Sequence, residues 1–126
     1  MVRCFNGSYA AHRAVGVCLF GLLLAGSACA GAPDPEVSVV MTDYGFEPSR
    51  FNVDRGKKTV LVLQNKGAEE HNLVLKQQNA ASPKVAPGQT VRFEVTLPPG
   101  TFPIICNIPG HEEAGMVGQI VSARGR

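Results

Sequence analysis

Residues 89–97, Gln-Thr-Val-Arg-Phe-Glu-Val-Thr-Leu, give the clearest indication of the fold. Apolar side chains occupy every second position of this stretch, which is the period of a strand with one buried face. Similar β-type patterns recur along the chain between turns that contain glycine or proline, such as Pro98-Pro99-Gly100. The further strands that these patterns predict span residues 36–42, 50–53, 59–64, 71–76, 101–106 and 117–122.

Short strands at this spacing predict an all-β protein, built as a two-sheet sandwich of about seven to eight strands. No segment has a sustained helical period, and the one long connection, residues 77–86, has room for a single helical turn. We expect one domain at residues 36–126, preceded by a Pro-rich linker at residues 29–35.

Residues 1–28 resemble an export signal. Arg3 and Arg13 make the start of the chain positive, and an apolar run follows at residues 15–26. This run is too short to span a bilayer, which needs about 20 residues. The sequence therefore predicts an exported protein, located in the periplasm or at the cell surface.

Two cleavage positions fit the small residues that follow the apolar run. The segment that ends at Cys29 resembles a lipobox, in which case Cys29 would be lipidated and would tether the protein to the membrane, although Gly26 departs from the usual pattern. Ala28-Cys29-Ala30 also fits an ordinary A-x-A site, which would release a soluble chain that begins at Gly31.

Loss of the signal changes the charge of the protein. The full chain has 12 Lys and Arg residues against 10 Asp and Glu, a formal net charge of +2. Two of the basic residues and none of the acidic ones lie in residues 1–28, so the exported part has a formal net charge of zero. Without a basic surplus, we expect no nucleic acid partner.

Cysteine usage gives the first indication of function. Of the four cysteines, Cys4 and Cys18 lie in the signal, and Cys29 is either lipidated or removed. Cys106 would then be the single thiol of the exported domain. Because exported cysteines usually pair, a lone one is either a buried inert residue or a metal ligand or reactive thiol.

Cys106 begins residues 106–116, Cys-Asn-Ile-Pro-Gly-His-Glu-Glu-Ala-Gly-Met, in which four residues separate Cys106 from His111 and four separate His111 from Met116. His71 lies upstream, at the start of a predicted strand. A thiolate, two neutral imidazoles and a weak axial thioether form the donor set of a type-1 copper site. Each residue alone is compatible with a structural role, but together they predict a copper site at His71, Cys106, His111 and Met116.

These motifs resemble the cupredoxin family of blue copper proteins, of the plastocyanin and rusticyanin kind, over residues 37–122. The resemblance includes Asn65, Gly67, His71 and Asn72 in one element, and it ends with the Cys-x4-His-x4-Met loop and the strand after it. It implies a Greek-key β-sandwich with one copper at one end.

The resemblance also implies a role for each ligand. His71, Cys106 and His111 would be equatorial and Met116 axial. Asn72 would link the two ligand loops through its side chain and direct its backbone N–H at the Cys106 sulfur, which would tune the potential.

The function predicted from these residues is one-electron transfer by a monomer that meets redox partner proteins transiently. The alternative is a protein that stores or delivers copper, although such proteins more often use Met and His clusters or paired cysteines. Catalytic copper sites need several more histidines than the two outside the signal, so we expect no enzyme activity. Structural zinc would gain little from Met116.

Overall fold

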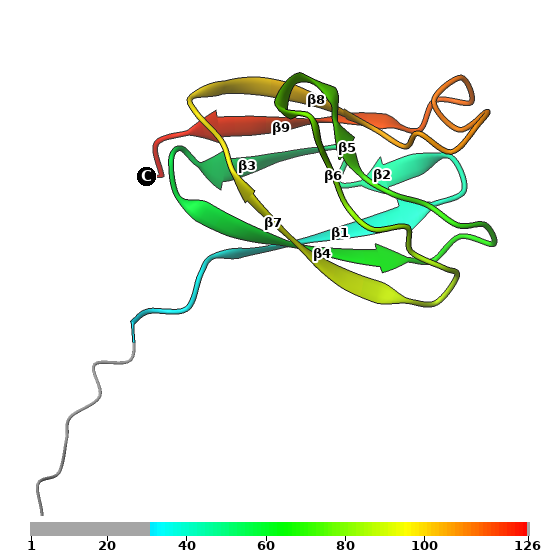
Figure 1. The fold of residues 1–126 in the computed structure, drawn as a ribbon, viewed down its shortest axis with the longest axis horizontal. Coiled ribbons are helices and arrows are strands. Elements are labelled where there is room, and N and C mark those ends of the chain that lie inside the picture. Colours follow the sequence, from blue (N-terminus) through cyan, green and yellow to red (C-terminus); the bar gives the residue numbers. More distant parts are fainter. Residues whose placement is uncertain (1–30, 126) are drawn as a thin grey trace, which may run out of the picture. The chain divides into compact units, whose positions relative to one another are not determined.

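A computed structural model describes residues 31–125 of the chain. The predicted signal, both cleavage positions and Cys29 lie outside the described residues. Within them the backbone forms nine strands and one short 3-10 turn, η1 (Figure 1). The elements are β1 (Glu36–Thr42), β2 (Gly45–Glu47), β3 (Arg50–Asp54), β4 (Lys58–Asn65), β5 (Val74–Leu75), η1 (Lys76–Gln78), β6 (Ala80–Ala81), β7 (Thr90–Thr96), β8 (Gly100–Ile105) and β9 (Val117–Ala123).

The strands form two sheets, one in the order β2-β1-β4-β7 and the other in the order β3-β9-β8-β5-β6. β1 runs parallel to β4 and β3 runs parallel to β9, whereas the other pairs are antiparallel. The chain changes sheet after β2, after β3, after β4, after β6 and after β7, so that it winds between the two layers. The all-β Greek-key sandwich predicted from the sequence is confirmed.

Apolar side chains from both sheets fill the space between the layers. Leu61 and Leu63 of β4 face Ile104 of β8 and Ile120 of β9 in one buried cluster, and all four side chains are fully buried. Burying a side chain of this size contributes about 1.5–3 kcal/mol. In a core packed at crystal-like density the strand ends have little freedom, so loops that leave these strands begin from fixed positions.

The predicted strand at residues 71–76 is largely wrong. Only Val74 and Leu75 pair as a strand, while His71 forms an isolated bridge with Val85 on the other side of the β5–β6 hairpin. The reason lies at Leu73, whose N–H bonds to the Ser82 hydroxyl (3.0 Å) and whose carbonyl accepts the Ser82 N–H (2.9 Å). A side chain thus takes one of the two backbone bonds of Leu73, and the regular ladder is interrupted where the ligand segment joins the sheet.

The other predicted strands agree with the structure to within one residue at each end. Two very short strands, β2 and β6, were not predicted because two or three residues show no periodicity. The connection at residues 77–86 had room for one helical turn, and a 3-10 turn, η1, is found at Lys76–Gln78.

Three connections meet at one end of the sandwich, on the right in Figure 1: the β1–β2 turn, the β4–β5 loop and the β8–β9 loop. β1 begins at the opposite end, where residues 31–35 have no regular structure and the Pro35 carbonyl accepts the Val60 N–H (2.9 Å). In residues 31–125 no helix is long and apolar enough to cross a membrane.

Candidate metal centre

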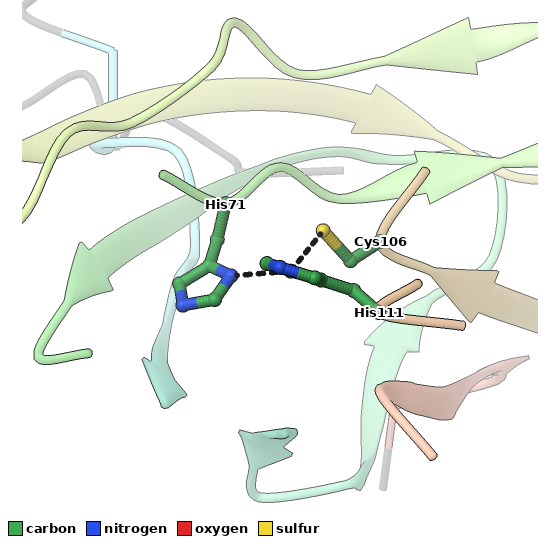
Figure 2. A group of neighbouring side chains, drawn as sticks. All are labelled: His71, Cys106 and His111. Carbon is green, nitrogen blue, oxygen red and sulfur yellow. Dashed lines mark hydrogen bonds between the residues drawn. The ribbon is translucent and has the colours of Figure 1, made fainter. Parts of the chain in front are cut away.

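Three of the four predicted ligands converge at this end of the sandwich. Nδ1 of His71 lies 3.1 Å from Nδ1 of His111, which in turn lies 3.6 Å from Sγ of Cys106 (Figure 2). Their donor atoms all lie within 4.8 Å of one another. His71 and Cys106 are fully buried and His111 is 6% exposed, so the donors are shielded from water.

The hydrogen bond of His111 indicates which of its two ring nitrogens is free to bind a cation. Its Nε2 lies 2.7 Å from Oε2 of Glu69, and an ionised carboxylate can only accept a hydrogen bond, so Nε2 carries the proton. The lone pair of His111 Nδ1 then faces His71 Nδ1 and the Cys106 sulfur. A pocket of two imidazole nitrogens and one thiol has the ligand softness and number that copper requires. The residues present therefore fit a single copper ion.

The loop that holds His71 is built around the buried side chain of Asn65 at the end of β4. Asn65 Nδ2 donates to the carbonyls of Glu69 and Val85, both at 2.7 Å, and its Oδ1 accepts the Gly67 N–H at 2.8 Å. The fully buried amide thus fixes the loop at Gly67 and Glu69 and ties it to Val85 in the segment between β6 and β7. His71 is thereby placed by the fold rather than by a metal.

Asn72 joins this loop to the loop that follows Cys106. Its Nδ2 donates to Oδ1 of Asn107 (2.8 Å), and its Oδ1 accepts the Asn107 N–H (3.1 Å). This pair of hydrogen bonds is the link between ligand loops that the family resemblance implied for the Asn72 side chain. The hydrogen bond predicted from the Asn72 backbone to the Cys106 sulfur stays a prediction.

Met116 closes the β8–β9 loop through its backbone. Its carbonyl accepts the Cys106 N–H (3.2 Å) and its own N–H donates to the His111 carbonyl (2.9 Å). Before it, Gly115 adopts a φ of +102°, a conformation that side-chain-bearing residues rarely adopt. The Met116 side chain is fully buried, and its role as axial ligand stays a prediction.

A second carboxylate faces the other histidine. Oδ1 of Asp43, in the β1–β2 turn, lies 3.5 Å from Nε2 of His71, which is too far for a hydrogen bond, so this buried nitrogen has no hydrogen-bond partner within residues 31–125. The same oxygen accepts the Ala68 N–H (2.6 Å), and this hydrogen bond lowers the pKa of Asp43. Burial lowers the pKa of His71, although Asp43 opposes this shift. His71 therefore stays neutral, as a metal ligand must be, to a lower pH than an exposed histidine.

Gly67 approaches both of these groups closely. A Cβ at this position would lie 2.6 Å from His71 Nε2 and closer still to the Asp43 carboxylate. The absence of a side chain at position 67 thus makes room for the contact between His71 and Asp43.

Sequence reasoning missed the parts played by Asp43 and Glu69. Neither lies in a spacing pattern, because their partners are 28 and 42 residues away. The available signal was general: a ligating histidine usually has a partner for its second ring nitrogen, and carboxylates are frequent partners.

The family model described as a cupredoxin-like domain matches residues 14–121 of this chain. The chain belongs to the cupredoxin family. With this membership and the buried His-Cys-His donor set, the predicted cofactor, a single copper, is confirmed. This cupredoxin is 36% identical to the copper-resistant cuproprotein CopI of Rubrivivax gelatinosus, over 68% of its own chain and 64% of that protein. It therefore spans a little less than two thirds of that relative.

Solved structures share the fold at lower identity. Reduced auracyanin from Roseiflexus castenholzii superposes with a TM-score of 0.64 and 22% identity, covering 74% of this cupredoxin and 99% of the auracyanin. The copper-containing nitrite reductase of Thermus scotoductus gives a TM-score of 0.60 and 21% identity, covering 75% and 28% of the two chains. These two likenesses show the fold that the cupredoxin shares with them.

Proposed function

We propose that this cupredoxin carries single electrons between redox partner proteins, using one type-1 copper that His71, Cys106, His111 and Met116 would hold. The observation that supports the proposal most directly is the burial and mutual approach of the three donors, the two Nδ1 atoms at 3.1 Å and the thiol at 3.6 Å from the nearer one. Bound copper would supply the redox change, between Cu(I) and Cu(II).

The protein contributes rigidity to this function. The donors come from two loops that begin at packed strands, and the Asn72–Asn107 pair holds the loops together. Loops supported in this way would keep the side chains of His71, Cys106 and His111 in nearly the same positions whether a bound metal is oxidised or reduced. Small rearrangement between the states gives a small barrier to electron transfer, which is what a carrier needs.

The remaining parts of the proposal concern location and partners. The apolar run at residues 15–26 supports export to the periplasm or cell surface, with Cys29 as a membrane tether if it is lipidated. The partners would be redox proteins that dock transiently on the end that holds His111. We propose that the protein is a monomer. We also propose that it has no enzyme activity, because a catalytic copper would need histidines beyond the two in residues 31–126.

Copper storage or delivery is a second candidate. It is favoured by the 36% identity to a protein whose name associates it with copper resistance. Such a protein would release its copper to an acceptor, whereas an electron carrier keeps the metal through many redox cycles. Retention of copper is therefore the property that separates the two functions.

The test is spectroscopic and electrochemical, on the purified protein after addition of Cu(II). A carrier should show an intense visible thiolate-to-copper band that bleaches with a mild reductant and returns on reoxidation. Repeated voltammetric cycles in the presence of a Cu(I) chelator should leave the signal unchanged. Rapid loss of copper to the chelator would favour delivery, and the absence of the band would contradict a type-1 site.

Cys106→Ser supplies the matched control for the ligand assignment. Serine has nearly the same shape but no thiolate, so the visible band should disappear while the sandwich stays folded. A Cys106→Ser protein that keeps the band would remove Cys106 from the site.

A further inference from the structure

Glu69 makes a contact that crosses between the two ligand loops. It lies two residues before His71, yet its carboxylate contacts the other histidine, with Oε2 at 2.7 Å from Nε2 of His111. The loop that presents one ligand thus also holds the imidazole of the other. The contact is made at the Nε2 edge of the ring, whereas the Cys106 sulfur lies near Nδ1.

The backbone around Glu69 is held in place on both sides. The Glu69 carbonyl accepts a hydrogen bond from the buried Asn65 amide (2.7 Å), and the Ala68 N–H donates to Asp43 (2.6 Å). Most surface ion pairs contribute little because two long side chains must be ordered to form them. Here His111 is buried and the Glu69 backbone is already fixed, so less ordering is needed.

We propose that Glu69 is a positioning residue of the copper site. By accepting the Nε2 proton of His111, it fixes the tautomer that leaves Nδ1 free for the metal, and its negative charge makes the imidazole a stronger donor. A stronger donor favours Cu(II) over Cu(I), so Glu69 lowers the reduction potential. This inference rests on the proposed function, since it takes His111 as a ligand.

Two variants separate the hydrogen bond from the charge. Glu69→Gln keeps an acceptor oxygen but loses the charge, whereas Glu69→Ala loses both. The Glu69 side chain is 67% exposed, so neither change removes a core contact. Glu113→Gln is the matched control, because it removes the same charge two residues from His111, at an exposed position.

The first measurement is NMR of the 15N-labelled, Cu(I)-loaded protein at one fixed pH. In wild type we expect the proton of His111 on Nε2 and exchanging slowly with water. Glu69→Gln should retain this slow exchange, and Glu69→Ala should accelerate it at least tenfold. Glu113→Gln should match wild type.

The second measurement is the reduction potential. Loss of a partner that supports a metal ligand typically costs 10–100-fold in affinity. Because the Glu69 side chain is well exposed, we expect the lower figure for Cu(II) and a smaller loss for Cu(I). A tenfold change in the ratio of the Cu(II) to the Cu(I) affinity is about 59 mV for one electron. Because Cu(I) also loses some affinity, both Glu69 variants should have potentials higher than wild type by up to about that amount, and Glu113→Gln by clearly less.

Specific results would overturn the inference. A His111 proton found on Nδ1, or an exchange rate unchanged in Glu69→Ala, would show that Glu69 does not hold the ring. Equal shifts in reduction potential for Glu69→Gln and Glu113→Gln would show that the shift comes from losing any nearby negative charge and not from the contact between Glu69 and His111. If wild type takes up copper and these results appear, only the inference fails; if wild type takes up no copper, the proposed function fails with it.

Discussion

Replacing Gly67 by alanine would place a methyl group where the structure has almost no space. The new Cβ would lie 2.6 Å from Nε2 of His71, and closer to the Asp43 carboxylate. Non-bonded carbon contacts normally lie at about 3.5 Å or more, so one of these groups must move by roughly 1 Å. Overpacking of this kind costs about 1–3 kcal/mol. For a domain of this size, each kcal/mol lowers the Tm by about 4–8 °C.

Gly45→Ala is the matched control. Gly45 lies in β2, and its added Cβ would meet only the Thr42 hydroxyl at 3.6 Å, an ordinary contact. Both changes remove a glycine from the unfolded chain, so the comparison cancels most of that effect. Denaturant unfolding of the metal-free proteins should show Gly67→Ala to be less stable by about 2 kcal/mol, and its visible copper band should weaken if His71 is the group that moves.

Equal stability of the two alanine variants, with an unchanged copper band in both, would refute this reasoning. It would mean that the β4–β5 loop yields to the methyl group at no cost. The hydrogen bonds that Asn65 makes to Gly67 and Glu69 of this loop would then not be holding His71 in position.

Three further outcomes follow from the described features. Met116→Leu should raise the reduction potential, because an apolar side chain disfavours Cu(II), and Met116→Gln should lower it, because a harder oxygen donor favours Cu(II). Both variants should retain copper. Voltammetry that fails to rank the potentials as Leu above Met above Gln would remove Met116 from the axial position. Ile120→Ala should destabilise the protein by about 2–5 kcal/mol in denaturant unfolding, since Ile120 is fully buried. Mass spectrometry of the native protein should find either a lipidated Cys29 or a free Gly31 at the N-terminus, and an intact Met1 would contradict export.

Most of the sandwich could be predicted because its strands are long enough to show a period. β1 begins and ends where its Val-rich pattern predicts, and β4, β7, β8 and β9 agree closely with theirs. The period also predicts which residues face inward, but not how deeply. Val95 and Leu97 are buried while Val91 and Phe93 of the same face are only partly covered, because the depth depends on which part of the opposite sheet covers them.

The candidate site was predictable for a different reason. Cys106, His111 and Met116 lie on one loop, where a short separation in sequence keeps residues close in space. His71 could be identified because it is the one other histidine outside the predicted signal. The segment around His71 was wrongly assigned to a strand, because Leu73 and Leu75 alternate as they would in one. That alternation does not reveal that Ser82 takes the backbone hydrogen bonds of Leu73. Such side-chain competition for backbone partners is decided by tertiary structure.

The position of the first strand has a consequence for where the chain enters the domain. β1 starts at the end opposite the site and runs for seven residues, after which the chain reaches Asp43 beside His71. At about 3.3 Å per residue, this strand separates the start of the domain from the copper end by roughly 20 Å. The chain therefore enters the domain at the pole opposite the site, and the pole that holds His71, Cys106 and His111 is formed by connections between strands.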